Sequence, residues 1–330
     1  MDAIIERAQA LSQTVALPEA TDTRTLRAAR MATDNKTADI ILIGSPDAVH
    51  AAAKNKNVSL DGIEIIDPAD ETIKSDNARL FYELREHKGI SEEDAEQTAL
   101  DPLYCATLLL KAGKVNATVA GAVTSTPNVL RPLFQLIGVA DGISLASSCF
   151  VMTTAHTHMG TDGAFIYADA GVNPEPTALQ LADIAIASAE SARIYLQTEP
   201  KVAMLSYSTM GSARHPSVQK VVEATRLAQD RRPDLLIEGE LQADAAIVPE
   251  VAAVKCPGSE LQGRANVLIF PDLAAGNIAY KLTQRLAGAG AYGPLLQGLA
   301  KVGMDLSRGA STDDICNVIA IAAVRSAVSQ

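Results

Sequence analysis

Short apolar runs of strand length alternate with helical segments along most of the chain, and this alternation limits the possible folds more than any other feature. The runs at 38–44 (ADIILIG) and 62–67 (GIEIID) are separated by a helical segment, and similar runs occur at 115–123, 201–207 and 265–270. A strand, a crossover helix and a second strand form the unit from which parallel sheets are built. At 330 residues the chain is longer than a typical single domain. The sequence therefore predicts an α/β protein with two domains and mainly parallel sheets.

Composition and charge exclude several classes of protein. The net charge is −11 and no long Lys/Arg run is present, which argues against nucleic-acid binding. No stretch approaches the roughly 18 uninterrupted apolar residues of a membrane span, and residues 1–7 do not form a secretory signal. The four cysteines are widely scattered without a C-x-x-C pair, which is typical of reduced thiols. We therefore expect a cytoplasmic protein that binds neither membranes nor nucleic acids.

The sequence shows no convincing metal or nucleotide motif. His156 and His158 are close together, but no third ligand adjoins them, and a metal site needs three or four convergent ligands. No G-x-G-x-x-G follows an apolar run, and the GK[ST] of a P-loop is absent. We therefore expect no metal site and no dinucleotide site.

The stretch 303–314 (GMDLSRGASTDD) carries the most chemical information. It holds the hydroxyl of Ser307, the guanidinium of Arg308 and the carboxylate of Asp314, and an apolar series with helical spacing follows it. A polar loop that enters a helix offers free N–H groups to an anion, and an arginine matches phosphate or carboxylate oxygens. We expect Gly303 and Gly309 to permit tight or positive-φ backbone conformations beside these groups.

Asp314 also has a purely structural interpretation. Ser311 and Asp314 have the spacing of a capping box, in which the carboxylate satisfies backbone donors at the start of a helix. A carboxylate used in this way would be a weak base. Judged on this stretch alone, capping is the commoner use of such spacing, and catalysis is the alternative.

Two hydroxyl-rich loops follow apolar runs, at the position where open α/β sheets bind ligands. The candidate substrate-binding residues in them are Ser125, Thr126, Ser208 and Thr209. Arg131 lies about one turn beyond the first loop and could assist it. In contrast, Arg24, Arg27 and Arg30 recur at i, i+3 and i+6, which predicts a solvated helix face.

Several long blocks, in collinear order over essentially the whole chain, resemble the phosphate acetyltransferase (phosphotransacetylase) family in its short form. The blocks are KVAMLSYSTMGSA (201–213), EGELQADAA (238–246), ANVLIFPDLAAGNIAYKLTQRL (265–286), GPLLQGL (293–299) and DLSRG (305–309). The resemblance implies reversible acetyl transfer between acetyl phosphate and coenzyme A, with coenzyme A as a substrate and no permanently bound cofactor. It implies direct attack by the thiolate in a ternary complex, without an acetyl-enzyme.

The resemblance also assigns roles to single residues. Asp314 would take the proton from the coenzyme A thiol, and Ser307 would stabilise charge on the acetyl carbonyl oxygen. Arg308 would hold the phosphoryl group, with Arg285 as a second contact to it. The family's coenzyme A arginines match Arg85 and Arg131.

The resemblance further implies a fold and an assembly. The fold is expected to resemble isocitrate and isopropylmalate dehydrogenases, with a substrate cleft between two α/β domains. We expect the first domain to comprise residues 1–146 and 298–330, and the second to comprise residues 147–297. A homodimer is also expected.

Three alternatives stay open at this point. The chain departs from the family pattern at 302–304 (VGM), before DLSRG, so it could use butyryl phosphate or another acyl phosphate. A non-catalytic acyl-CoA-binding protein is a second alternative, against which Ser307, Arg308 and Asp314 argue jointly. An isocitrate-dehydrogenase-type oxidoreductase is the third, but its metal and nicotinamide sites are not found. We expect Cys316, although near this stretch, to pack in a helix and not to act as a nucleophile.

Overall fold

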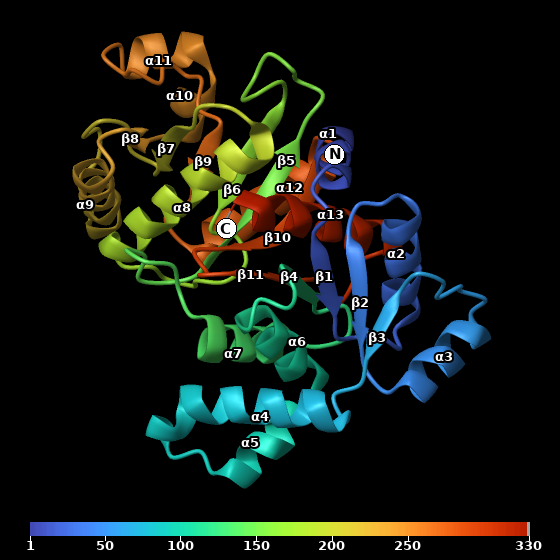
Figure 1. Cartoon of the computed structure of the whole chain (residues 1–330). Coiled ribbons are helices and arrows are strands. Elements are labelled where there is room, and N and C mark those ends of the chain that lie inside the picture. The colour runs from blue at the N-terminus through green and yellow to red at the C-terminus, as the bar shows by residue number, and fades with distance from the viewer. Residues whose placement is uncertain (329–330) are drawn as a thin grey trace. The chain divides into compact units, whose positions relative to one another are not determined.

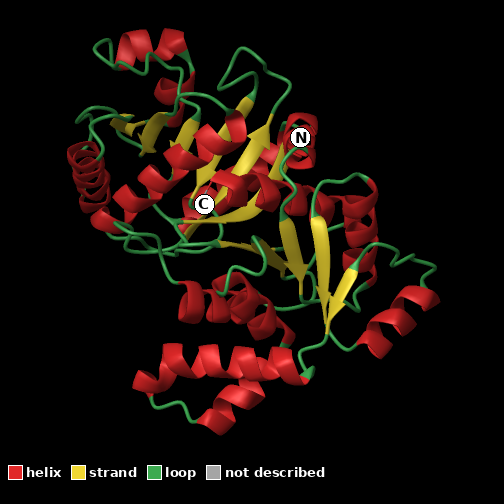
Figure 2. Ribbon diagram, viewed as in Figure 1, coloured by secondary structure: helices red, strands yellow, loops and turns green. Residues whose placement is uncertain are grey.

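The computed structural model describes residues 1–328 (Figures 1 and 2). The chain divides into two compact units, of which the first comprises Met1–Ala140 with Leu299–Gln330 and the second comprises Asp141–Gly298. Each unit has its own sheet and its own covering helices. The prediction of two α/β domains with mainly parallel sheets is confirmed.

The first unit, within residues 1–328, is built on a five-stranded parallel sheet with the strand order β11-β4-β1-β2-β3. Its strands are β1 (Thr14–Leu17), β2 (Asp39–Ile43), β3 (Glu64–Ile66), β4 (Ala117–Ala120) and β11 (Val302–Asp305). The residues of β4 and β11 are all buried, as expected of parallel strands that are covered on both faces. The strand order reverses beside β1, because β2 and β3 lie on one side of it and β4 and β11 on the other.

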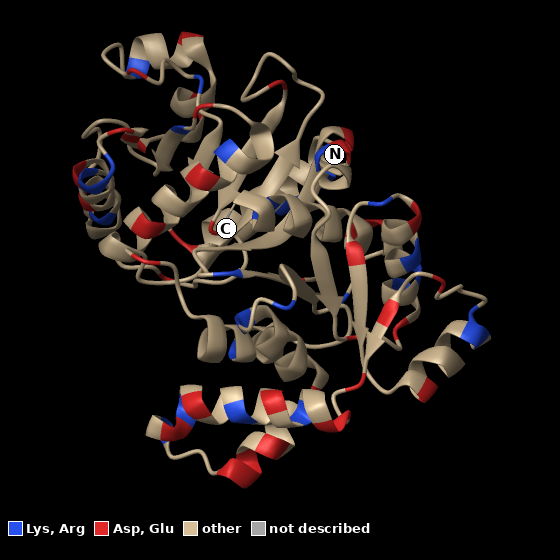
Figure 3. Cartoon of the chain, in the orientation of Figure 1, with Lys and Arg blue, Asp and Glu red and all other residues tan. Residues whose placement is uncertain are grey.

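Helices cover both faces of this sheet. The helices of the first unit are α1 (Asp2–Gln9), α2 (Thr23–Asp34), α3 (Pro46–Asn55), α4 (Glu71–Arg85), α5 (Glu92–Ala99), α6 (Pro102–Lys111), α7 (Thr126–Pro132) and α13 (Thr312–Val328), with short turns η1 (Glu86–Lys88) and η2 (Leu133–Ile137). Helix α13 packs on α2, α1 and the strands β4 and β11, which explains why it is apolar around most of its circumference. Helices α4 and α5 pack together as a hairpin on α6 (Figure 1), and charges of both signs cover this hairpin (Figure 3).

The second unit contains, among the described residues, a six-stranded mixed sheet with the order β10-β5-β6-β9-β7-β8. Its strands are β5 (Ser147–Thr153), β6 (Ala164–Ala168), β7 (Lys201–Leu205), β8 (Leu236–Leu241), β9 (Val267–Ile269) and β10 (Gly290–Gln297). Strand β5 runs antiparallel to both β10 and β6, and the other pairs are parallel. The helices are α8 (Ala178–Leu196), α9 (Pro216–Arg231), α10 (Ala243–Ile247), α11 (Pro249–Lys255) and α12 (Leu273–Leu286).

Strands β10 and β11 were not predicted from the sequence. Residues 290–297, interpreted as part of a glycine-rich connection, form β10, and residues 302–305 form β11. Neither Gly303 nor Gly309 is among the described glycines with positive φ, but Gly309 lies in a tight turn, the other conformation that was expected. Gly303 lies inside β11, where a Cβ would collide with the side chain of Leu133. The glycine there permits close packing of Leu133 and does not form a turn.

Candidate active site

The predicted catalytic residues lie at the carboxyl edge of the first unit's sheet. Strands β11, β4 and β1 are adjacent and parallel, and Asp305 at the end of β11 is opposite Ala120 at the end of β4. The loops that follow these strands therefore start at the same edge. This edge is also the place where the strand order reverses, which is where open α/β sheets bind ligands.

Ser307 and Arg308 are exposed on the loop between β11 and α13. The N–H of Leu306 donates to the carbonyl oxygen of Ala120 at 2.7 Å, which anchors the start of the loop to β4. The Ser307 Oγ accepts from the N–H of Gly309 at 3.2 Å. Within residues 1–328 the guanidinium of Arg308 has no hydrogen-bond or ion-pair partner. Because no carboxylate neutralises it, this guanidinium can receive an anionic group.

Asp314 forms the capping box that the sequence spacing indicates. Its Oδ2 accepts from the N–H of Ser311 at 2.9 Å and from the Ser311 hydroxyl at 2.8 Å, while its own N–H donates to Ser311 Oγ at 3.1 Å. The side chain is exposed, and its Oδ1 has no partner in the described part of the chain. A carboxylate has lone pairs on both oxygens, so capping through Oδ2 leaves Oδ1 available to accept a proton. The two interpretations of Asp314 are therefore compatible.

Ser125 and Thr126 lie at the start of α7, in the loop that follows β4. Ser125 occupies the N-cap position, although its side chain makes no capping hydrogen bond. The Thr126 hydroxyl donates to Oδ2 of Asp305 at 2.7 Å. Burial raises the pKa of Asp305 to about 6, and the charge of Glu19 adds to this rise, against the opposite effect of the Thr126 bond. The structure thus brings the two hydroxyl residues next to the loop of Ser307 and Arg308.

Glu19, which the sequence reasoning did not select, fixes the loop after β4. Its Oε2 accepts from the N–H groups of Gly121 and Ala122 at 3.0 and 2.7 Å. Its Oε1 accepts from those of Val123 and Thr124 at 3.1 and 2.8 Å. The carboxylate is buried and comes from the segment that follows β1. It therefore holds four consecutive backbone donors in one orientation.

Arg24 joins the two site loops, and the prediction that it belongs to a solvated helix face is wrong. Its Nη1 donates to the carbonyl oxygens of Arg308 at 2.9 Å and Ala310 at 3.0 Å, and its Nη2 donates to that of Ala122 at 2.6 Å. It also pairs with Asp22, the N-cap residue of α2, at 3.2 Å. Arg27 is exposed. The sequence did contain a signal for Arg24, because this residue lies next to a helix N-cap that closely follows a strand. In open α/β sheets, the helices that begin at the carboxyl ends of the strands lie beside the ligand site.

Arg85 and Arg131 both lie close to Tyr104, on α6. Burial raises the pKa of Tyr104, while the positive charges of Arg131 and Arg85 act in the opposite direction. The Tyr104 hydroxyl donates to Oε1 of Gln135 at 2.8 Å. Neither arginine has a hydrogen-bond or ion-pair partner among residues 1–328. Both arginines that the resemblance assigned to one substrate are therefore within electrostatic range of the same tyrosine.

The other predicted site residues belong to the second unit. Ser208 and Thr209 are buried, with exposed fractions of 0% and 5%. The Ser208 hydroxyl donates to Oε1 of Glu240 at 2.8 Å, and Thr209 Oγ1 accepts from the N–H of Gln242 at 3.0 Å. These contacts hold the loop after β7 to the end of β8, and the substrate role of both hydroxyls stays a prediction. Arg285 is exposed in the last turn of α12, and its predicted phosphate contact is likewise untested.

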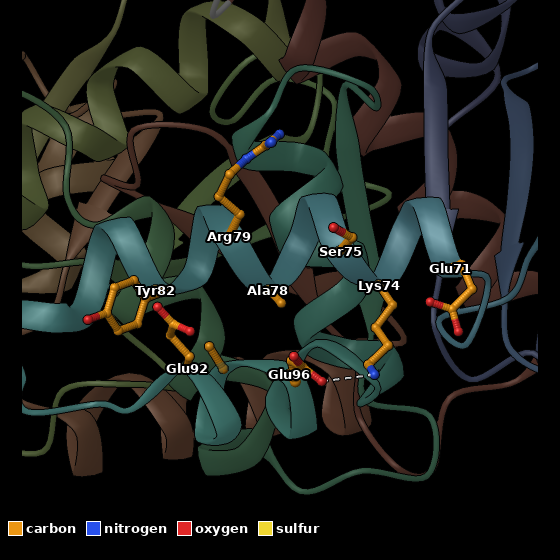
Figure 4. Close-up of a pocket in the computed structure, with 9 residues that line it drawn as sticks. Glu71, Lys74, Ser75, Ala78, Arg79, Tyr82, Glu92 and Glu96 are labelled. Carbon is orange, nitrogen blue, oxygen red and sulfur yellow. Dashed lines mark ion pairs between the residues drawn. The ribbon is translucent and has the colours of Figure 1, made fainter.

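Other surface features do not coincide with the predicted site. A pocket of about 350 Å³ lies between α4 and α5 (Figure 4), but Lys74 in it is already paired with Glu96 at 3.0 Å. Among the described residues, no group of three or more His, Cys, Asp or Glu could hold a metal ion. Over the same range, no helix is both long and apolar enough to cross a membrane.

Comparison with known proteins gives a consistent result. The family model described as "Phosphate acetyl/butaryl transferase" matches residues 1–323. The phosphate acetyltransferase of Acetivibrio thermocellus is 48% identical over 325 residues, which cover 98% of this chain and 97% of that protein. The phosphate acetyltransferase of Clostridium acetobutylicum is 47% identical, with coverage of 98% of both proteins. These relatives are transferases.

Solved structures agree with these matches. The EutD phosphotransacetylase from Staphylococcus aureus is 40% identical with a TM-score of 0.91, and covers 98% of each chain. A phosphotransacetylase from Streptococcus pyogenes is 38% identical with a TM-score of 0.93, covering 98% of this chain and 97% of that one. The whole-chain match to the family model and the relatives' identity over nearly their full length show that this chain belongs to the phosphate acetyl/butyryl transferase family.

Proposed function

We propose that this protein is a phosphate acetyltransferase, which transfers acetyl reversibly between acetyl phosphate and coenzyme A. The observation that carries the proposal is the match over nearly the whole chain to relatives that are 43–48% identical and share this activity by name. The geometry supports it, since one loop and the helix turn after it carry an exposed hydroxyl, a guanidinium and a carboxylate oxygen, the last two without a partner in the described residues.

Acetyl transfer requires removal of a proton from the coenzyme A thiol. A thiol with a pKa of ~8.5 is mostly protonated at neutral pH, so a nearby base increases the reactive thiolate. In our proposal Oδ1 of Asp314 accepts this proton, and the capping contacts at Oδ2 hold the carboxylate in a fixed orientation. The thiolate sulfur then bonds to the carbonyl carbon of acetyl phosphate. The bond between that carbon and the phosphate oxygen breaks, and phosphate leaves with the electron pair.

Negative charge develops on the carbonyl oxygen and on the leaving phosphate during this step. Ser307 would donate its hydroxyl to the carbonyl oxygen, and Arg308 would bind the phosphate, with Arg285 as its second contact. One well-placed donor of this kind contributes about 3 kcal/mol to the stability of the transition state. Arg85 and Arg131 would bind phosphate groups of coenzyme A beside Tyr104.

Direct transfer in a ternary complex is the mechanism that we propose, without an acetyl-enzyme and without a permanently bound cofactor. Cys316 is the thiol nearest to the site in sequence, and it is buried. Burial raises the pKa of this thiol, with a smaller contribution from Asp313. A buried, protonated thiol is a poor nucleophile, which supports the packing role expected for Cys316.

We also propose a cytoplasmic homodimer. The four cysteines, all within the described range, are buried as thiols, which supports a reducing compartment. Ile278, Leu282 and Leu286 are 58%, 51% and 82% exposed and follow each other at four-residue spacing on α12. Such an exposed apolar stripe supports burial against a second copy. Light scattering coupled to gel filtration should give the mass of a dimer, and Leu282→Glu should reduce it to that of a monomer.

The test of function is thioester formation from acetyl phosphate and coenzyme A, followed by ultraviolet absorbance. Asp314→Ala should reduce the rate at least a hundredfold, whereas Asp313→Asn, its exposed neighbour in the same turn, should retain most of it. Circular dichroism checks that both variants are folded. A preference for butyryl phosphate would keep the mechanism and change the substrate. No thioester from either donor would refute the proposed function and favour a non-catalytic acyl-CoA-binding protein.

A further inference from the structure

Asp305, the last residue of β11, is a buried carboxyl group whose two oxygens differ in their surroundings. Its side chain is 2% exposed. Oδ2 accepts the hydroxyl of Thr126 at 2.7 Å, whereas Oδ1 is buried with no hydrogen-bond partner in residues 1–328. A buried polar atom without a partner costs free energy and calls for an explanation. Stability of the fold alone does not provide one.

The hydrogen bond between Asp305 and Thr126 connects two parts of the candidate site directly. Asp305 lies two residues before Ser307 and three before Arg308. Thr126 is the first residue of α7, the helix that also carries Arg131. The side chain of Asp305 thus ties the start of the loop with the hydroxyl and the guanidinium to the start of α7.

The packing around Asp305 leaves little room for these two parts to move independently. Gly121, which directly follows β4, has a φ of +112°, a value that residues other than glycine rarely adopt. A Cβ on it would lie 2.5 Å from Oδ1 of Asp305 and 2.6 Å from the nitrogen of Leu306. The backbone after β4 therefore packs directly on Asp305, and a shift of this carboxyl would displace both loops.

We propose that Asp305 is a positioning residue of the transfer reaction, which acts through Thr126 to fix the loop of Ser307 and Arg308 against the start of α7. The inference rests on the proposed phosphate acetyltransferase function. Asp305 is too buried to touch a substrate, so its contribution is made through the groups that it places. Misplacement of catalytic groups by about 1 Å can reduce a rate by roughly a hundredfold.

The decisive variants are at Thr126, which is only partly buried. Thr126→Val keeps the shape and removes the hydroxyl, and Thr126→Ser keeps the hydroxyl and removes a methyl group. We expect Thr126→Val to lower kcat at least tenfold, because it loses a hydrogen bond to a charged group. The KM for each substrate should stay within about twofold of the wild-type value. Thr126→Ser should keep kcat within about threefold of the wild-type value.

Asp305→Asn and the double variant Asp305→Asn/Thr126→Val complete a thermodynamic cycle. If the two residues act through one bond, the double variant should be no slower than the slower single variant. A thermal denaturation of each protein shows whether it is folded at the assay temperature. If Asp305→Asn does not fold, the two Thr126 variants still decide the question.

Several results would overturn the inference. They are a kcat for Thr126→Val within twofold of wild type, a Thr126→Ser variant as slow as Thr126→Val, or effects of the two single variants that multiply in the double variant. If the wild-type protein is active and any of these results is obtained, the inference about Asp305 is refuted and the proposed function is not. An inactive wild-type protein refutes the proposed function, and the inference with it.

Discussion

Replacement of Glu19 by glutamine tests how much the buried carboxylate contributes to the candidate site. The carboxylate accepts four backbone N–H groups, and the side-chain amide of glutamine has only one oxygen to accept them. The NH2 group of the glutamine would then face the N–H groups of two residues, and no hydrogen bond forms between two donors. The amide oxygen should stay with Gly121 and Ala122, whose N–H groups are the buried pair, and the NH2 group should face Val123 and Thr124, which are partly exposed.

The magnitude follows from the two contacts that are lost. A hydrogen bond to a charged group contributes about 1.5–3 kcal/mol, so two of them amount to about 3–6 kcal/mol. Water can reach the partly exposed N–H groups of Val123 and Thr124, which favours the lower end of this range. We therefore expect Glu19→Gln to lower the free energy of unfolding by about 3 kcal/mol. The rate of acetyl transfer should fall as well, because the loop that carries Ser125 and Thr126 loses its anchor.

The assay is urea denaturation followed by circular dichroism, with thioester formation measured on the same samples. Glu83→Gln is the matched control, since Glu83 is an exposed glutamate of the same unit, on α4. It should change the free energy of unfolding by less than about 0.5 kcal/mol. If Glu19→Gln were as stable as this control and equally active, the four hydrogen bonds would contribute little to the stability of the fold or to the rate of acetyl transfer.

Three further predictions concern charged groups of the first unit. The folded-state pKa of Asp305, about 6 against an ordinary 3.8, means that this group stabilises the fold fully below pH 4 and loses that contribution as pH rises through 6. The loss is about 3 kcal/mol. The difference in unfolding free energy between wild type and Asp305→Asn should therefore change with pH between 4 and 7. A constant difference would contradict the raised pKa of Asp305. Arg24→Gln should lower kcat/KM at least tenfold, because the guanidinium holds carbonyl groups of both site loops, while Arg27→Gln on the same helix should not; steady-state kinetics of the two variants decide this. Arg85→Gln and Arg131→Gln should each raise KM for coenzyme A about tenfold and leave KM for acetyl phosphate unchanged, and an equal rise in both constants would argue against a coenzyme A site beside Tyr104.

The sequence by itself determined the fold class and which of the proposed catalytic groups are neighbours. Apolar runs of strand length mark β2, β4, β7 and β9, because a strand buried on both faces must be apolar throughout. Ser307, Arg308 and Asp314 lie within eight positions of each other, so no knowledge of the fold was needed to group them. The capping box at Asp314 was likewise readable, since its contacts span only three residues.

The strands β10 and β11 could not be predicted in the same way. Strand β10 contains two glycines and Pro294, and β11 contains one glycine, and these residues are poor signals for a strand. Their positions come from partners elsewhere in the chain, since β10 pairs with β5 and β11 with β4. The close contact of Gly303 in β11 is likewise with Leu133, a residue distant in sequence.

Only the tertiary structure decided the roles of Glu19, Arg24 and Asp305. Glu19 accepts from N–H groups more than 100 residues away, Arg24 donates to carbonyl groups as far away as residue 310, and Asp305 accepts from Thr126. Local patterns reveal periodicity and caps, because those contacts span only a few residues. The partners of these charged groups meet only when the parallel strands β1, β4 and β11 bring their carboxyl ends together at one edge of the sheet.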